Sequence, residues 1–185
     1  MQERTLAILI AQAGIASVIN LCDTESGLKS KVRISPWYRK LYQNNCVIAL
    51  GMNFGFDNVY FRNKLKKALQ FIINTEGPWL IHCNAGVDRT GFVSMVLESL
   101  MKASIDEIAN DYLESFNSAF DSSVFSRINN NDHLAVMQLL SVMNDSENIT
   151  DQNLQEIAEN YLEHTVGLTA TEIMQLKGKL SGQYY

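Results

Sequence analysis

Apolar residues along the chain form two kinds of pattern, and the order of those patterns predicts the fold class. Three short runs are mostly apolar and rich in β-branched residues, as in buried parallel strands: residues 15–21 (IASVINL), 46–50 (CVIAL) and 79–82 (WLIH). Elsewhere apolar residues recur every three or four positions, which is typical of amphipathic helices. Strands alternate with helices first, and helices alone follow. We therefore predict an α/β fold with a small, mostly parallel central sheet flanked by helices and a helical C-terminal extension.

Helices are predicted wherever the apolar spacing follows the helical period, over residues 3–13, 59–74, 89–103, 104–118, 132–143, 151–165 and 169–180. Two of them open with a capping box, formed by Ser104 with Glu107 and by Thr169 with Glu172. Residues 28–40 are basic and are broken by Pro36, so we expect a short helix or an irregular excursion there. Residues 121–128 carry no clear pattern.

Composition indicates one globular domain. The chain has 185 residues, 46% of them hydrophobic, and only two prolines, which is enough apolar material for a sizeable core. We expect a single domain over 1–185, made of a sheet part (1–103) and a helical part (104–185). No apolar run reaches the length of a membrane span, so no stable membrane insertion is expected. Three cysteines, an odd number, suit a reducing compartment; we expect a cytoplasmic protein, with export of a longer precursor left open.

Charge is unevenly distributed along the chain, whose net charge is −5. From residue 90 to the end there are four basic and fourteen acidic residues. Between residues 26 and 75, Asp57 is the one acid among nine basic residues: Lys29, Lys31, Arg33, Arg39, Lys40, Arg62, Lys64, Lys66 and Lys67. This asymmetry describes either two solvated faces or a basic border that steers an anionic substrate into a site. The acidic remainder argues against a nucleic-acid partner, and the oligomeric state stays open.

The stretch over residues 79–91 (WLIHCNAGVDRTG) combines a strand, a loop of small residues and the start of a helix. Such a loop gathers backbone N–H groups beside a helix N-terminus, which makes an anion cradle. Cys83 lies at the mouth of the cradle, where a thiolate is favoured. Arg89 follows six residues later and can donate two N–H bonds to phosphate oxygens. The stretch therefore predicts a nucleophile beside its substrate group, whereas Cys22 and Cys46 are predicted to be small buried hydrophobes.

The sequence HCNAGVDRTG resembles the signature loop of the cysteine-based protein tyrosine phosphatase superfamily. It is most similar to the bacterial tyrosine phosphatases that also include lipid-phosphatase members. The stretches VINLCDTE and GLTATEIMQL resemble less specific parts of the same family. The resemblance implies a phosphatase-like fold and a two-step phosphoester hydrolysis that needs no metal and no cofactor. The family usually has a further N-terminal segment before the first helix.

The resemblance also implies roles for the residues of this loop. Cys83 attacks phosphorus and forms a phosphocysteine, and Thr90 donates a hydrogen bond to the sulfur. Backbone N–H groups of the loop and the Arg89 guanidinium hold the phosphate oxygens. His82 supports the loop and tunes the thiol. The phosphate-binding positions are Asn84, Ala85, Gly86, Val87, Asp88 and Arg89.

The leaving oxygen needs a proton donor, and the sequence leaves this role open between aspartates. Asp88 lies inside the loop, and phosphatases with Asp-Arg-Thr there, several acting on phosphoinositides, can use that aspartate. Asp57 follows the second strand in a glycine-rich loop, where many superfamily members carry the acid. The alternative role of Asp88 is to orient the loop, and that of Asp57 is to cap a helix. Asp23 is a further candidate, although a loop cap is the simpler interpretation.

The sequence indicates the substrate class less directly than the reaction. Lipid-phosphatase loops often carry a lysine before Asp-Arg, where this chain has Val87, which weakens the case for a polyphosphorylated inositol headgroup. Trp37 and Tyr38 either flank a phosphotyrosine ring or pack onto the sheet. If they fold over the pocket, five basic residues could supply the positive charge that Val87 lacks: Lys29, Lys31, Arg33, Arg39 and Lys40.

The sequence thus favours a protein-tyrosine phosphatase, with broader or lipid phosphoester activity as the alternative, and a phosphorylated protein or lipid as the partner. Two other classes stay open. One is a phosphate-binding module without turnover. The other is a sulfur-transfer or arsenate-reducing enzyme in which Cys22 or Cys46 resolves Cys83. His133 and His164 have no Cys or Asp partners at ligand spacing, so no metal site is predicted.

Overall fold

The parallel sheet predicted from the apolar runs is present. The computed structural model describes residues 12–31, 35–119, 132–144 and 148–182, so most of the helix predicted over 3–13 and all of 121–128 lie outside the described residues. Strands β1 (Ser17–Asn20), β2 (Val47–Ala49) and β3 (Trp79–His82) form one sheet in the order β2-β1-β3. Both pairings are parallel, so the three carboxyl ends meet at one edge.

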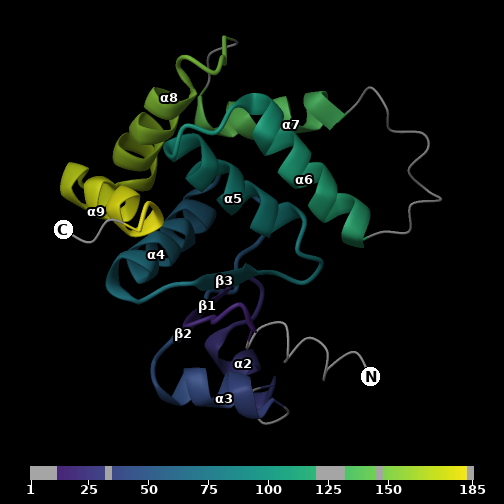
Figure 1. The fold of residues 1–185 in the computed structure, drawn as a ribbon, viewed down its shortest axis with the longest axis vertical. Helices are drawn as coiled ribbons and strands as arrows, with labels where there is room; N and C mark the ends of the chain where they lie inside the picture. Colours follow the sequence, from purple (N-terminus) through teal and green to yellow (C-terminus); the bar gives the residue numbers. More distant parts are fainter. Residues whose placement is uncertain (1–11, 32–34, 120–131, 145–147, 183–185) are drawn as a thin grey trace.

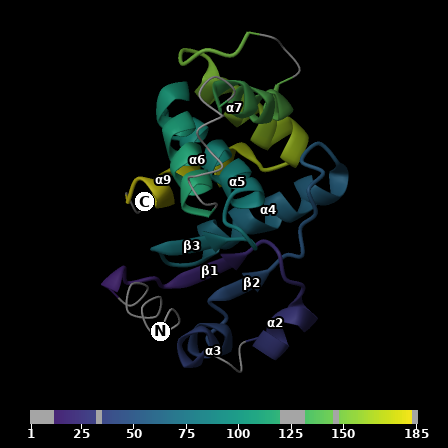
Figure 2. The same cartoon turned by 90° about the vertical axis from the view of Figure 1, so that its right-hand side faces the viewer.

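Helices cover both faces of this sheet (Figure 1). On one side lie α2 (Glu25–Lys31) and α3 (Pro36–Gln43), and on the other α4 (Val59–Asn74) and α5 (Asp88–Leu100). Figure 2 shows the same layers edge-on. The helical part packs beyond α4 and α5 and contains α6 (Ile105–Ala119), α7 (Asp132–Leu140), a 3-10 turn (Ser141–Met143), α8 (Leu154–Asn160), a π-helical segment (Tyr161–Val166) and α9 (Ala170–Leu180). None of the described helices is long and apolar enough to cross a membrane.

Local capping explains where several helices begin. The Asn58 side chain accepts a bond from the Phe61 N–H, and α4 has the predicted bounds. Both predicted capping boxes are confirmed by reciprocal side-chain and backbone bonds. The break predicted at Pro36 is a start instead, because Pro36 stands in the first turn of α3 behind the cap Ser35. Proline is favoured there because its missing N–H would have no partner in any case.

The predicted central helix is α5, which is buried over most of its surface. Its Phe92 packs against Phe56 and Phe61, with ring centroids 4.9 and 5.5 Å away. The helix ends at Leu100, before the predicted residue 103, because the following turn takes Lys102 to a φ of 69°. This packing holds the N-terminus of α5 at the carboxyl edge of the sheet, where the signature loop enters it.

Candidate active site

The signature loop, residues 82–91 (HCNAGVDRTG), joins β3 to α5 at the carboxyl edge of the sheet. Ligands of parallel sheets bind beyond that edge. Gly86 has a φ of 79°, and a Cβ built there meets nothing within 4 Å. The need for glycine is therefore conformational and not a matter of space. The left-handed turn bends the backbone back toward Cys83, whose sulfur accepts a bond from the Gly86 N–H at 3.3 Å.

Cys83 is only 8% exposed, and its surroundings favour the thiolate. Burial by itself raises the pKa of the thiol. Hydrogen bonds from Thr90 and from the Gly86 N–H, together with the charge of Arg89, more than offset burial, so the pKa lies below its ordinary value. The Thr90 hydroxyl is buried, and no group other than the Cys83 sulfur accepts from it among the described residues. The chemistry expected of this cysteine therefore has a physical basis.

Arg89 is a buried cation that is only partly paired. Its side chain is 8% exposed, and Nη1 donates to the Met52 carbonyl at 3.0 Å. The Phe54 ring covers the guanidinium, with its centroid 4.5 Å from Cζ. Within the described part of the chain, Arg89 Nε has no hydrogen-bond partner. A buried donor without a partner is costly, and an anion bound in the loop would satisfy it.

A chain of polar contacts supports the loop from below. His82 lies between the Cys83 carbonyl, 3.2 Å from Nδ1, and the Tyr38 hydroxyl, 3.3 Å from Nε2. Asn20 donates to that hydroxyl at 3.2 Å and to an Asp23 carboxylate oxygen at 3.0 Å. Tyr38 is thus tied to the edge of the sheet, as the packing alternative expected. Sequence reasoning missed Asn20, which is 1% exposed; the signal was a polar residue at the end of a buried strand.

A model of the tyrosine phosphatase family matches residues 34–182. The chain belongs to the tyrosine phosphatase family. The matched range includes the signature loop and GLTATEIMQL, and it begins after β1 and VINLCDTE. The predicted family and the phosphatase-like α/β fold are therefore confirmed, and membership supports phosphatase activity. No curated protein and no solved structure matches the chain significantly.

The two candidate acids of this tyrosine phosphatase family member, Asp88 and Asp57, lie in different places. Asp88 is the first residue of α5, is exposed, and belongs to the same loop as Cys83 and Arg89. It is close to Tyr112, whose pKa is raised by burial and then by the charge of Asp88. The Tyr112 ring also packs over Gly91, where a Cβ would meet it at 2.7 Å. The structure thus places Asp88, within the signature loop, next to Tyr112 of α6.

Asp57 turns toward the helical part instead. It lines a cavity of about 260 Å³ that contains no residue of the signature loop. The other lining residues are Arg62, Val142, Met143, Asn144, Tyr161 and Thr165. Its backbone carbonyl accepts a bond from Arg62 Nη2 at 2.6 Å. The capping role considered for Asp57 belongs to its neighbour Asn58. The role of Asp57 as the acid stays a prediction without a contact that supports it.

The other two cysteines differ from their prediction as buried hydrophobes. Cys22 and Cys46 are each only partly buried, and all three cysteines are free. Cys22 lies just beyond the end of β1, where its sulfur is 3.3 Å from the Asn20 amide oxygen. Cys46 precedes the edge strand β2, and its sulfur is 3.4 Å from the Asn44 carbonyl. Both positions lie next to the end of a strand, Cys22 after β1 and Cys46 before β2, which explains the partial exposure.

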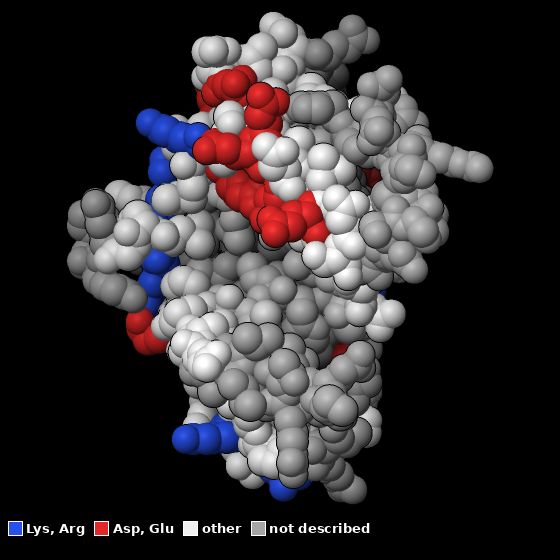
Figure 3. All heavy atoms as spheres, turned by 45° about the vertical axis from the view of Figure 1, so that its right-hand side comes forward, with Lys and Arg blue, Asp and Glu red and all other residues white. Residues whose placement is uncertain are grey.

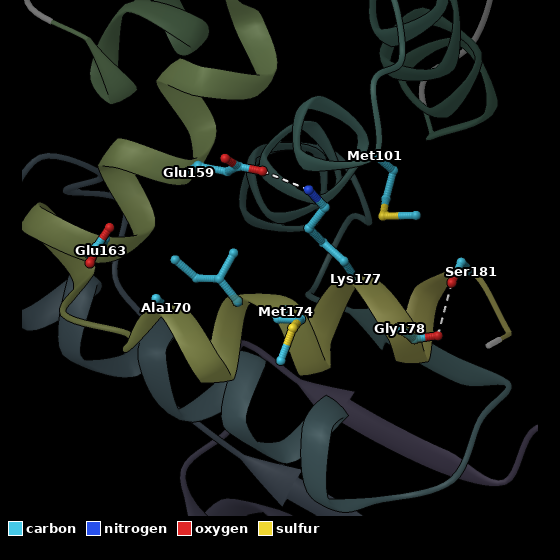
Figure 4. A pocket seen from close by; sticks show the side chains of 9 residues that line it. Met101, Glu159, Glu163, Ala170, Met174, Lys177, Gly178 and Ser181 are labelled. Atoms are coloured by element: carbon cyan, nitrogen blue, oxygen red, sulfur yellow. Dashed lines mark hydrogen bonds and ion pairs between the residues drawn. The ribbon is translucent and has the colours of Figure 1, made fainter. Parts of the chain in front are cut away.

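Figure 4 shows a cavity of about 440 Å³ from close by. It opens between α9, the π-helical segment and the end of α5, and the Lys177–Glu159 ion pair crosses it at 2.7 Å. None of its lining residues belongs to the signature loop.

In the described part of the chain, no three His, Cys, Asp or Glu side chains gather as a metal-binding group. The side chain of His133 lies outside the described residues.

Proposed function

We propose that this protein hydrolyses phosphoesters with Cys83 as the nucleophile, and that protein phosphotyrosine is its main substrate. Family membership supports phosphatase activity in general. The observation that carries the finer proposal is the pairing of Cys83, whose pKa is lowered, with the buried and incompletely paired Arg89 in one loop. A thiolate nucleophile next to a cation that can bind phosphate oxygens is the arrangement needed for attack on a phosphate ester.

In the first step the Cys83 thiolate attacks phosphorus, so a sulfur–phosphorus bond forms as the bond to the leaving oxygen breaks. The leaving oxygen takes a proton from a carboxylic acid. Asp88 is the better candidate, because it shares the loop with Cys83, whereas Asp57 lines another cavity. Backbone N–H groups of the loop and the Arg89 guanidinium stabilise the phosphoryl oxygens as charge moves.

In the second step water attacks the phosphocysteine, the sulfur–phosphorus bond breaks, and inorganic phosphate leaves. The sulfur departs as a thiolate, which the contact with Thr90 favours because it lowers the pKa of Cys83. The carboxylate that gave up its proton in the first step accepts one from the attacking water. The enzyme therefore returns to its starting state without a co-reactant.

Two features of the loop's surroundings favour a phosphotyrosine over a lipid headgroup. The Phe54 side chain is 60% exposed although its ring lies over Arg89, so an apolar surface is offered beside the anion site. Such a surface suits the ring of an aryl phosphate. Val87, which stands where lipid phosphatases often have a lysine, is 1% exposed and provides no charge. A polyphosphorylated headgroup would thus meet only one positive side chain of the loop.

The proposal is tested with a panel of phosphotyrosine peptides, phosphoserine peptides and phosphoinositides, assayed for phosphate release in excess chelator. We expect phosphotyrosine peptides to have the highest kcat/KM and Cys83→Ser to abolish release from every substrate. Full activity of Cys83→Ser would reject the mechanism. Tight phosphopeptide binding by the parent without phosphate release would instead identify a binding module. Fastest turnover of a phosphoinositide would support the lipid alternative.

A further inference from the structure

A groove runs beside the signature loop on the side of α6. Its volume is about 350 Å³, and Ala85 and Gly86 of the loop form one wall. The opposite wall is one face of α6, made of Asp111, Glu114, Ser115 and Ser118. Because the loop itself is a wall, a chain attached to a phosphate bound at Cys83 begins next to this groove. The groove is therefore an extension of the candidate active site and not a separate cavity.

The α6 wall of this groove is negatively charged. Asp111 and Glu114 are both exposed, and α6 carries four acidic residues and no basic one. Glu98 lies next to Asp111: burial and then the charge of Asp111 raise the pKa of Glu98 to about 7, so the negative charge of this pair rests mainly on Asp111 at neutral pH. Figure 3 shows acidic side chains gathered in a band across the helical part of this face. The charge beside the loop is thus of the same sign as the substrate that the loop binds.

The loop supplies an independent indication that an anion binds in it, next to this wall. Arg89 is 8% exposed, and its Nε has no hydrogen-bond partner among the described residues. Its unpaired donor lies in the loop that also contributes Ala85 and Gly86 to the groove. An anion in the loop is repelled by carboxylates alongside it. The arrangement becomes favourable when the same substrate carries a positive group that pairs with the wall.

We propose that the substrates of this phosphatase carry a lysine or arginine close to the phosphorylated residue, and that Asp111 and Glu114 bind it. The inference rests on the proposed function, because it needs a phosphopeptide in the loop. An extended peptide advances about 3.3 Å per residue, so a long cationic side chain one or two residues away reaches a groove that starts at Ala85. The hydroxyls of Ser115 and Ser118 offer further acceptors. The same wall disfavours polyphosphorylated headgroups.

The test uses phosphotyrosine peptides that are identical except for lysine, glutamine or glutamate beside the phosphotyrosine. For the parent we expect kcat/KM to be highest with lysine and lowest with glutamate. Asp111→Asn with Glu114→Gln should lower kcat/KM for the lysine peptide about three- to twentyfold through KM, the range of two exposed ion pairs. The same variant should raise kcat/KM for a small anionic aryl phosphate, since a repulsive charge is removed.

A matched control removes the same two charges elsewhere. Asp106 lies on α6 outside the groove lining, and Glu163 lines the remote cavity between α9 and the π-helical segment. Asp106→Asn with Glu163→Gln should keep the parent's preference for the lysine peptide. Equal loss of preference in both variants, or no preference in the parent, would overturn the inference. The proposed function survives these results as long as Cys83→Ser abolishes phosphate release, so the two failures are distinguishable.

Discussion

The two loops that follow β2 and β3 reach the same edge of the sheet, and both carry an aspartate that the sequence proposed as the acid. The loop after β3 concentrates its chemistry in one place, since Thr90 and Arg89 both lie near enough to Cys83 to lower its pKa. The residues of the loop after β2 face two different parts of the molecule. The Met52 carbonyl and the Phe54 ring turn toward Arg89, while Asp57 turns to the helical part. A strand end thus indicates where a loop lies but not which of its side chains faces the site.

The largest effect should come from the nucleophile in the loop after β3. Cys83→Ser replaces a thiolate by a hydroxyl that stays protonated at neutral pH, so we expect kcat to fall on the order of 10⁴-fold or more. Phosphate release from a phosphotyrosine peptide measures it. Cys22→Ser is the matched control and should retain activity. A similar loss in both variants would point to misfolding, which circular dichroism and thermal unfolding of each variant would reveal.

The next effect separates the two aspartates. Asp88→Asn should lower kcat about 10²-fold on phosphotyrosine, a poor leaving group, and far less on an activated aryl phosphate that needs no proton. Asp57→Asn should change both rates by about twofold or less, because Asp57 lines another cavity. Reversed results would show that the loop after β2 moves to bring Asp57 to the substrate. Equal losses on both substrates would reject either residue as the acid.

A pH effect sharpens the description of the loop after β3. Burial by itself raises the pKa of Cys83. Hydrogen bonds from Thr90 and Gly86, together with the charge of Arg89, have a larger effect in the opposite direction, so the net pKa is lowered. Thr90→Val removes one of the lowering contacts, so the thiolate should form only at higher pH. The measurement is the rate of Cys83 alkylation by iodoacetamide against pH. Its midpoint should rise in Thr90→Val and stay in place in Asn53→Ala, a change in the other loop.

The smallest effect concerns the aromatic residue of the loop after β2. Phe54→Ala should lower kcat/KM for a phosphotyrosine peptide about three- to tenfold, the range of one aromatic contact, and Phe54→Trp should restore it. An alkyl phosphate has no ring to contact, so its kcat/KM should change little. Equal losses on aryl and alkyl phosphates would mean that Phe54 acts by holding Arg89 and not by contacting the substrate.

Short-range features of this fold were predictable from the sequence. β3 and α4 have the predicted bounds, and both capping boxes form between residues three positions apart. The signature loop is also local, because Cys83 and Arg89 lie six residues apart and the charge of Arg89 acts on the Cys83 thiol. Backbone hydrogen bonds and caps act within one helical turn, so a pattern of neighbours determines them.

Contacts across long stretches of chain were not predictable in the same way. The Arg89 bond to the Met52 carbonyl joins residues 37 positions apart, and the His82–Tyr38 contact joins residues 44 positions apart. The acidic wall of α6 also meets the loop through packing of α5 against α6. The sequence by itself determined the signature loop, its cysteine and arginine, and the order of strands and helices along the chain. Only the tertiary structure decided that Asp57 lines a cavity away from the loop and that carboxylates of α6 border the loop, because side-chain direction depends on which elements pack together.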